Sequence, residues 1–332
     1  MKKIKIAQIG MNGNSHGPDI FNTLKKFPEI FEIVGYVLPE NERGRLDNNR
    51  MAAFEGYKEL TLDEVLNNSE IEAVTIETDE IYTAKYALMA AKAGKHIHME
   101  KPGGTSLAEF EELIAEVKKG GKVFHTGYMY RYNPYVIEIL KKVKSGELGE
   151  IISVEAQMNC IHPKEKRQWL EAFPGGMMFF LGCHLVDLIL LIQGQPEKII
   201  PYNKCTGAGG VTAKDFGMAI FEYKNGISFA KTNATEIGGF ARRQLVVVGT
   251  KGTVELKPFE MYENGQMYTG KTEYDSTDWN NMGRTIKSDY IDRYENMMSS
   301  FACYVRGEKE NPYTYDYELE LYKTVLKACG VE

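Results

Sequence analysis

Short apolar strands alternate with helical segments through the first 126 residues of the chain. The first strand, Ile4–Ile9, runs into a glycine-containing turn. After that turn, apolar residues recur at helical spacing at Ile20, Phe21, Leu24 and Phe27. Further strands are expected at residues 32–38, 73–77, 95–100 and 123–126, with helices at 60–66, 82–93 and 107–118. This alternation predicts an α/β fold with a doubly wound parallel sheet.

The turn after the first strand has the outline of a dinucleotide-binding loop. In the fingerprint G-x-G-x-x-G, glycine lets the backbone approach a pyrophosphate, whose charge is met by free N–H groups at the helix N-terminus. Here asparagine holds the second glycine position and serine holds the third. By itself the turn fits a nucleotide loop and an ordinary capped turn about equally. The candidate cofactor contacts in it are Gly10, Met11, Asn12, Gly13 and Ser15.

The end of the second strand bears on the choice between NAD and NADP. An acidic residue at this place binds the ribose hydroxyls of NAD, and Glu40 is the candidate. Leu38, at the end of the strand, is a further candidate cofactor contact. Arg43 and Arg45 follow closely and could instead pair with the 2′-phosphate of NADP. They are equally consistent with a solvated surface. The expected cofactor is therefore NAD or NADP, with a slight preference for NAD.

A charged pair stopped by proline, Glu100-Lys101-Pro102, ends the fourth strand. Ligands bind at the carboxyl edge of a parallel sheet, so this strand aims a lysine at the ligand edge. Thr78 follows the third strand and should reach the same edge. Thr78, Glu100 and Lys101 are accordingly candidate cofactor contacts. Most lysines at strand ends are surface residues, but the following proline and the edge position favour a functional role for Lys101.

Beyond Gly127 the sequence becomes rich in strands. Strands are expected at 151–158, 215–234, 244–248 and 253–257, with turns at Lys224-Asn225-Gly226, Gly249–Gly252 and Asn264-Gly265. Helices are expected at 135–144, 183–192, about 290–306 and about 317–329. We therefore expect a Rossmann domain at residues 1–126 and, at 127–332, an α+β domain with a large, mostly antiparallel open sheet.

Composition excludes several classes of partner. A chain of 332 residues usually needs two cores, and a formal net charge of -6 gives no basic footprint for nucleic acid. The amino terminus lacks the apolar stretch of a signal peptide, and no apolar run could span a bilayer. The five scattered cysteines suggest neither disulfides nor a metal site. We expect a cytoplasmic protein with a small-molecule ligand and no membrane partner.

Several motifs together give the chain a resemblance to a known family. They are Gly94-Lys95-His96 leading into Glu100-Lys101-Pro102, the run Gly127–Pro134 (GYMYRYNP), Gly175-Gly176 leading to His184-Leu185-Val186-Asp187, and Val248–Thr253. The chain resembles the Gfo/Idh/MocA oxidoreductases, which include glucose-fructose oxidoreductase and inositol dehydrogenase. The resemblance implies hydride transfer between NAD(P) and a secondary hydroxyl of a sugar, cyclitol or glycoside. It also implies a homodimer or homotetramer formed through the second sheet.

The resemblance assigns catalytic roles to three residues. Lys101 matches the family lysine that stabilises the developing oxyanion and assists proton transfer. His184 matches the catalytic histidine, although a histidine among leucines is ordinarily a core residue. Asp187 lies three residues later on the same predicted helix face, where its carboxylate could orient or charge the imidazole. The substrate hydroxyl is expected between Lys101 and His184.

The chain departs from the family pattern at Phe180. An aspartate is common there, four residues before the histidine, and phenylalanine makes that wall apolar. Lys101 and His184 could suffice for dehydrogenation, the substrate could present an apolar face, or the redox step could serve cleavage of a neighbouring glycosidic bond. A cofactor-binding regulatory protein without turnover is the alternative from another class.

The remaining candidates come from two segments. Tyr128 and Arg131 match the stretch that passes the nicotinamide, although Arg131 could instead serve only to pin the hinge. His162 and Trp169 lie in the expected loop before Gly175 and could contact substrate. Trp169 could stack on a sugar ring or simply fill the core of that loop. The substrate candidates are Lys101, Tyr128, His162, Trp169, Phe180 and His184.

Overall fold

The computed structural model describes residues 2–331, which form two compact units. Unit 1 comprises the residues up to Met129 together with Tyr294–Tyr322, and unit 2 comprises Tyr130–Arg293 and the residues from Lys323 onward. The units differ from the expected division at residues 126 and 127 because a late segment joins unit 1. Phe301 in that segment packs on His125, and Tyr322 stacks on Phe110.

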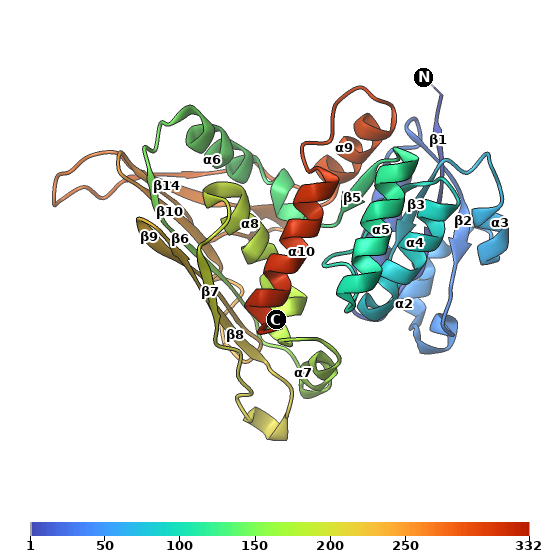
Figure 1. Ribbon diagram of the computed structural model, residues 1–332, viewed down its shortest axis with the longest axis horizontal. Helices are drawn as coiled ribbons and strands as arrows, with labels where there is room; N and C mark the ends of the chain where they lie inside the picture. The colour runs from blue at the N-terminus through green and yellow to red at the C-terminus, as the bar shows by residue number, and fades with distance from the viewer. Residues whose placement is uncertain (1, 332) are drawn as a thin grey trace. The chain divides into compact units, whose positions relative to one another are not determined.

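Unit 1 is built on a five-stranded parallel sheet with the order β2-β1-β3-β4-β5 (Figure 1). Its strands are β1 Ile4–Ile9, β2 Phe31–Val37, β3 Ala73–Ile76, β4 His96–Met99 and β5 Phe124–Thr126. Its helices are α1 Gly17–Lys26, α2 Asn48–Met51, α3 Leu62–Leu66, α4 Thr83–Lys92, α5 Leu107–Gly120 and α9 Glu295–Val305. The predicted parallel, doubly wound sheet is confirmed.

Helices cover both faces of this sheet, and the side chains of its central strands are buried on both faces. Phe124 and His125 are neighbours on β5 and so point to opposite faces. Phe110 of α5 packs edge-on against Phe124, whereas Phe301 of α9 stacks on His125. Helix α5 begins where the Ser106 hydroxyl accepts from the Glu109 N–H, and it ends at Gly121 with φ 59°.

Unit 2 contains an eight-stranded sheet with the order β15-β14-β11-β10-β6-β9-β8-β7. Its strands are β6 Ile151–Asn159, β7 Lys198–Pro201, β8 Phe216–Tyr223, β9 Gly226–Asn233, β10 Gln244–Gly249, β11 Thr253–Leu256, β14 Gly270–Tyr274 and β15 Arg284–Lys287. All neighbouring strands are antiparallel except β6 and β9. The expectation of a mostly antiparallel sheet is confirmed.

The predicted turns occur where the sequence placed them. Strands β8 and β9 join through residues 224 and 225, and β10 joins β11 through residues 250–252. Asn264 and Gly265, with φ 52° and 77°, connect β12 Met261–Glu263 to β13 Gln266–Tyr268. Two successive positive φ angles suit a tight hairpin turn, and asparagine and glycine tolerate them best.

Two helical segments differ from expectation. Helix α9 begins at Glu295 and not near Tyr290, because the Ile291 N–H donates to the Met267 carbonyl (2.8 Å) and holds that stretch against a strand. The stretch before Gly175 is not a loop but contains α7 Lys164–Trp169, which starts after Pro163. The other helices are α6 Pro134–Ser145, α8 Cys183–Gln193 and α10 Tyr315–Cys329, the last contributing to both units.

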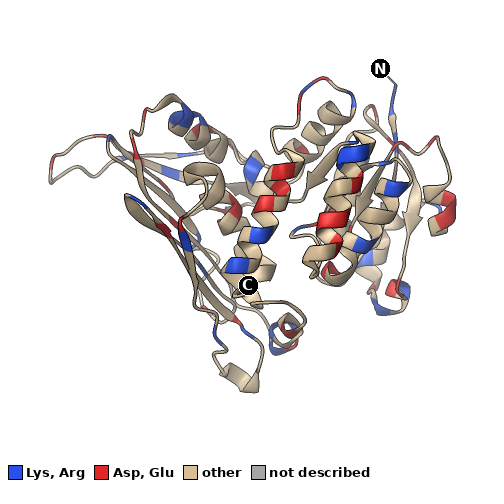
Figure 2. Cartoon of the chain, viewed as in Figure 1, with Lys and Arg blue, Asp and Glu red and all other residues tan. Residues whose placement is uncertain are grey.

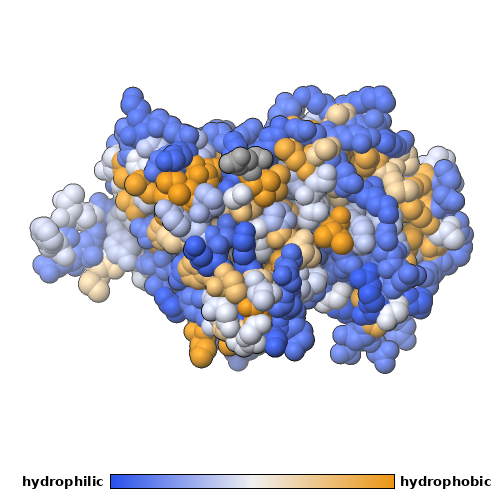
Figure 3. Space-filling view, turned by 60° about the horizontal axis from the view of Figure 1, so that its bottom comes forward, coloured by the Kyte–Doolittle hydropathy of each residue, from blue (hydrophilic) through white to orange (hydrophobic). Residues whose placement is uncertain are grey.

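The views in Figures 2 and 3 show how charged and apolar residues are distributed. Figure 2 shows basic and acidic residues mixed along helices such as α5 and α10, without a stripe of one sign. On the face drawn in Figure 3, apolar residues form separate patches between hydrophilic ones. Among residues 2–331 no helix is long and apolar enough to cross a membrane.

Candidate active site

The glycine-rich turn of unit 1 is braced by the asparagine that replaces the second glycine. The Asn12 Oδ1 accepts from the backbone N–H groups of Asn14 (2.6 Å) and Ser15 (2.7 Å), and its Nδ2 donates to the Thr78 carbonyl (2.8 Å). Gly10 has φ 90°, and a Cβ there would lie 2.5 Å from the Thr78 side chain. The turn thus requires glycine at position 10 and is folded by the Asn12 carboxamide.

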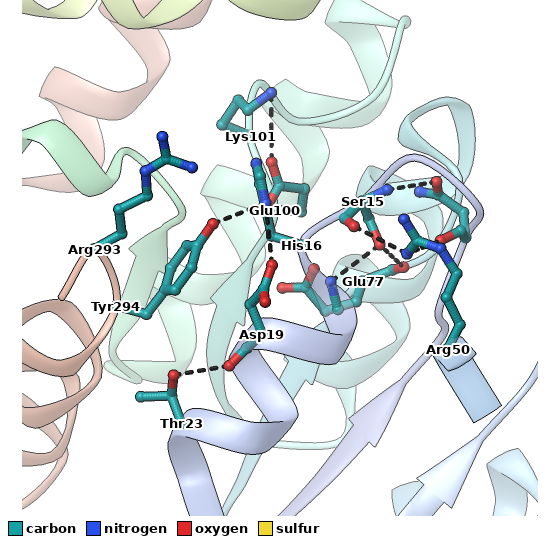
Figure 4. Close-up of polar contacts among 12 residues, drawn as sticks. Ser15, His16, Asp19, Thr23, Arg50, Glu77, Glu100, Lys101, Arg293 and Tyr294 are labelled. Atoms are coloured by element: carbon teal, nitrogen blue, oxygen red, sulfur yellow. Dashed lines mark hydrogen bonds and ion pairs between the residues drawn. The ribbon is translucent and has the colours of Figure 1, made fainter. Parts of the chain in front are cut away.

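Arg50 is a contact of this turn that the sequence did not indicate. Its Nη1 donates to the carbonyls of Asn12 (2.8 Å) and Ser15 (3.1 Å) (Figure 4). Arg50 comes from the short helix α2, for which no expectation was formed. The guanidinium brings a positive charge to the loop where a pyrophosphate is expected.

Two glutamates follow β2, and they have different surroundings. The Glu40 carboxylate accepts from Lys85 Nζ (2.6 Å) and the Tyr86 hydroxyl (2.8 Å), and these hydrogen bonds hold its pKa below the usual value. Glu42 is 1% exposed, and its Oε2 accepts from the Met11 N–H (3.0 Å). Burial raises the pKa of Glu42 to about 7.

Glu42 thus contacts the glycine-rich turn, whereas Glu40 was the acid expected to bind the ribose. Its Oε1 is buried and has no hydrogen-bond partner among the described residues. A buried, unsatisfied acceptor beside the turn is chemically suited to a ribose hydroxyl. Leu38 is half-buried, Arg43 pairs with Glu59, and Arg45 pairs with Asp79. The residues present therefore fit a dinucleotide.

Replacing Glu42 with glutamine should make stability less dependent on pH. Because the pKa of Glu42 rises from 4.5 to about 7 on folding, its contribution to stability is full below pH 4.5 and is lost as the pH rises through 7. We expect Glu42→Gln to gain up to about 3 kcal/mol relative to wild type between pH 5 and 8. Urea unfolding followed by far-UV circular dichroism measures this difference. A constant difference across this range would contradict the assignment.

Lys101 and Glu100 lie at the carboxyl edge of the unit 1 sheet, as expected. The Lys101 Nζ is 3.5 Å from Glu100 Oε1, and both side chains are 4% exposed (Figure 4). Two further carboxyls that were not predicted, Glu77 and Glu80, are buried at the same edge. Burial is the main cause of a raised pKa for each, to about 7 for Glu80 and well above the usual value for Glu77. Tyr128 is also buried in unit 1.

In unit 2, Asp187 pairs with Arg131. The Asp187 Oδ2 accepts from Arg131 Nε (2.9 Å), and Oδ1 accepts from Nη2 (2.8 Å), in a bidentate arrangement. The two side chains are 1% and 0% exposed. Asp187 was expected to orient His184, and in the structure both of its oxygens accept from Arg131.

His184 lies in the first turn of α8 and packs against an anchored tyrosine. The Tyr130 ring meets it edge-on, with ring centroids 4.9 Å apart and planes at 86°. The Tyr130 hydroxyl bonds to Glu260 and accepts from Arg243 Nη1 (3.3 Å). His184 is 2% exposed, so its imidazole is buried against the hydrogen-bonded Tyr130 ring.

The other substrate candidates of unit 2 form an aromatic cluster around Phe180. Trp169 meets Phe180 edge-on at 5.2 Å, Phe173 lies parallel to it at 6.4 Å, and His162 is 6.5 Å away. Lys166 Nζ lies 5.1 Å from the Phe180 ring centre. Burial, with Lys166 nearby, lowers the pKa of His162 to about 4, so its ring is neutral. The structure thus joins His162, Trp169 and Phe180 in one wall.

Comparisons with known proteins agree with this architecture. Residues 4–128 match the model of an oxidoreductase family with an NAD-binding Rossmann fold, and residues 136–255 match the GFO/IDH/MocA C-terminal domain. A trans-1,2-dihydrobenzene-1,2-diol dehydrogenase of Bos taurus is 27% identical over 84% of this chain and 82% of its own. A scyllo-inositol 2-dehydrogenase (NADP(+)) of Bacillus subtilis is 26% identical over 42% of this chain and 40% of its own.

Solved structures share the fold over nearly the whole chain. A levoglucosan dehydrogenase in complex with NADH and levoglucosan superposes with a TM-score of 0.80 at 16% identity, covering 99% of this chain and 98% of that one. An aldose-aldose oxidoreductase from Caulobacter crescentus gives 0.78 at 17% identity, covering 99% and 98%. The resemblance inferred from the motifs is therefore confirmed. The chain belongs to the GFO/IDH/MocA family and is an NAD(P)-dependent oxidoreductase acting on CH–OH groups.

Proposed function

We propose that this enzyme oxidises a secondary hydroxyl of a cyclic polyol, sugar or glycoside, with Lys101 and His184 as its catalytic residues. The observation that carries the proposal is the buried Lys101 at the carboxyl edge of β4, in the unit that matches the NAD-binding family model. The bound nicotinamide supplies the hydride acceptor. Lys101 stabilises the developing oxyanion, and His184 takes part in proton transfer.

A dehydrogenase assay tests this directly. The purified protein is incubated with NAD or NADP and a panel of sugars, cyclitols, glycosides and cyclic diols while the absorbance of the reduced nicotinamide is followed. Reduction with at least one member supports the proposal. Release of an aglycone without net reduction would favour redox-assisted cleavage. Tight cofactor binding without reduction of the cofactor by any member would favour a regulatory protein.

The aromatic cluster supports a substrate with an apolar face. Phe180 stands where the family commonly has a carboxylate, and Trp169 and Phe173 enclose its ring. The related dihydrobenzenediol dehydrogenase is named for a diol on an apolar ring. We therefore favour aryl glycosides and cyclic diols within the proposed class.

Truncating Phe180 should discriminate between substrates. We expect Phe180→Ala to raise KM for aryl glycosides and cyclic diols about tenfold, the equivalent of roughly 1–2 kcal/mol of lost apolar contact. KM for a free sugar should change little. The matched control is Phe240→Ala, a ring in the same unit that stacks on Tyr262. Equal increases for both substrate types would contradict the specificity role.

We also propose that the enzyme prefers NAD, with Glu42 and not Glu40 as the ribose-binding acid. Glu40 is held by Lys85 and Tyr86, whereas Glu42 touches the turn. An ionised Glu42 would repel a 2′-phosphate, since like charges 4 Å apart near a surface interact by about 4 kcal/mol. Cofactor contacts remain proposed for Gly10, Met11, Asn12, Gly13, Ser15, Leu38, Thr78, Glu100 and Arg131.

Affinities for the two cofactors test this assignment. We expect Glu42→Ala to weaken the binding of NAD and to strengthen the binding of NADP. The ratio of their Kd values should change by at least about tenfold. Isothermal titration calorimetry gives both constants. Glu40→Ala is the control and should change the ratio much less. A larger change in this Kd ratio for Glu40→Ala would indicate that Glu40, and not Glu42, binds the ribose.

The outer face of the unit 2 sheet supports a homodimer or homotetramer. Ile220 pairs with Phe229, which pairs with Glu155, and these side chains are only partly buried in the monomer. Light scattering of the purified protein measures the assembly. An Ile220→Asp variant should shift it toward monomer if this face forms the interface.

A further inference from the structure

A row of polar side chains crosses the buried α9 face of the unit 1 sheet. Strand register places Gln8 of β1 beside Thr75 of β3, Thr75 beside His98 of β4, and His98 beside His125 of β5. These four strands are neighbours in the sheet. Each of the four residues is at most 1% exposed. The Thr75 hydroxyl donates to Gln8 Oε1 (3.3 Å), and Phe301 of α9 covers both imidazoles. Polar groups this deep are costly unless they bond to one another.

The two imidazoles of this row are hydrogen-bonded to each other. His98 Nδ1 is 2.7 Å from His125 Nδ1, so one nitrogen donates and the other accepts. Burial lowers the pKa of His98 to about 3, so its ring is neutral. The Nε2 of His98 lies 3.9 Å from Oε1 of Glu77, which follows β3 directly. The pair therefore presents a ring nitrogen to a buried carboxyl.

Glu77 is a fully buried carboxyl whose two oxygens have no hydrogen-bond partner among residues 2–331. Charged groups face it from several elements. Asp19 of α1, Glu80 and Glu100 disfavour its ionised form, and Lys101 favours it. Figure 4 shows Glu77 beside Ser15 of the glycine-rich turn, in the same group of polar residues as Glu100. Burial and the three acidic neighbours outweigh Lys101 and raise the pKa of Glu77, which favours its protonated form when no further cation is present.

We propose that Glu77 is a redox-linked proton site, protonated beside the reduced cofactor and ionised beside the oxidised nicotinamide. This inference depends on the proposed function, which brings the nicotinamide to the edge where Glu77 lies. The oxidised ring carries one more positive charge than the reduced ring. A nearby cation favours a carboxylate, so the oxidised cofactor expels the proton of Glu77 and the reduced cofactor permits its return.

The step balances during substrate oxidation. The alcohol loses a hydride to the oxidised nicotinamide and a proton through the hydroxyl, and the carboxylate of Glu77 becomes a carboxylic acid. The products are the carbonyl compound, the reduced cofactor and a protonated Glu77, so the enzyme holds the proton until oxidised cofactor binds again. The neutral His98 ring, whose Nε2 lies 3.9 Å from Glu77 Oε1, places no positive charge beside the carboxyl that would oppose its protonation.

The pH dependence of cofactor affinity tests the inference. For wild type, affinity for the oxidised cofactor should rise by up to roughly tenfold per pH unit across the window in which Glu77 changes protonation on binding. Affinity for the reduced cofactor should change much less. Fluorescence titrations from about pH 5.5 to 9 give both sets of Kd values. The preferred cofactor is used in its oxidised and reduced forms.

Three variants assign the effect to one residue. Glu77→Gln keeps the volume but cannot ionise, and should abolish the difference in slope. Glu80→Gln removes another buried carboxyl at this edge and should retain most of the difference in slope. Thr75→Val breaks the same polar row without removing a titratable group and should also retain it. A slope that survives in Glu77→Gln, or vanishes only in Glu80→Gln, overturns the inference.

Direct proton counting in wild type guards against misfolding of the Glu77 variant. Adding oxidised cofactor to weakly buffered protein with a pH indicator should release a proton, and adding reduced cofactor should release much less. Equal release from the two forms overturns the inference while leaving the proposed function intact. If neither form binds, the proposed function and this inference both fail.

Discussion

Lys101→Ala is expected to lower kcat/KM by about 10³-fold while cofactor binding persists. Lys101 is buried beside Glu100 at the carboxyl edge of the parallel sheet. The variant removes both the positive partner of the developing oxyanion and a group that exchanges its proton. Initial rates with the best substrate of the panel, together with Kd for the cofactor, separate loss of chemistry from loss of binding.

Two further lysine variants sharpen this result. Lys101→Arg keeps the positive charge but cannot release a proton near neutral pH, so partial recovery would show that charge matters independently of proton transfer. Lys92→Ala is the matched control, because Lys92 pairs with Glu112 on the surface of the same unit. Undiminished turnover in Lys101→Ala would refute the proposed mechanism.

Asp187→Ala is expected to lower the free energy of unfolding by about 3–5 kcal/mol. The Arg131 guanidinium is buried and loses its bidentate carboxylate in this variant, and an uncompensated buried charge is costly. Both tryptophans of the chain, Trp169 and Trp279, belong to unit 2, so urea unfolding followed by tryptophan fluorescence reports on that unit.

The controls for this prediction use an exposed ion pair and a double replacement. Asp316 pairs with Lys118, and their side chains are 77% and 57% exposed, so Asp316→Ala should cost less than about 1 kcal/mol. Replacing Arg131 with methionine and Asp187 with leucine together should recover much of the loss. A cost below 1 kcal/mol for Asp187→Ala would show that the buried pair is not a structural anchor.

Asp187 illustrates how far sequence spacing carries an argument about a site. The helix predicted to carry both His184 and Asp187 is confirmed as α8. Spacing along a helix cannot reveal which residue from another segment occupies the same face. Arg131 lies 56 positions earlier and reaches Asp187 only because the chain folds α8 against the segment before α6.

Glu42 and Arg50 illustrate the same limit at the cofactor loop. A ribose-binding acid was expected after β2, and Glu40 was nearest to the strand end. The structure bends the chain through positive φ angles at Glu40 and Asn41, 55° and 57°, and so delivers Glu42 to the Met11 N–H. No periodic pattern encodes that bend, and none marks Arg50.

The sequence by itself determined the parts of this protein that depend on local periodicity and turn chemistry. Alternating strands and helices implied a parallel sheet, Asn-Gly pairs implied hairpins, and the position of Lys101 at the ligand edge followed from strand order. Tertiary structure alone decided that Tyr294–Tyr322 joins unit 1, that Asp187 binds Arg131, and that Glu77 lies beside His98. The reason is that long-range partners are selected by packing and burial of the whole chain, which short-range spacing does not record.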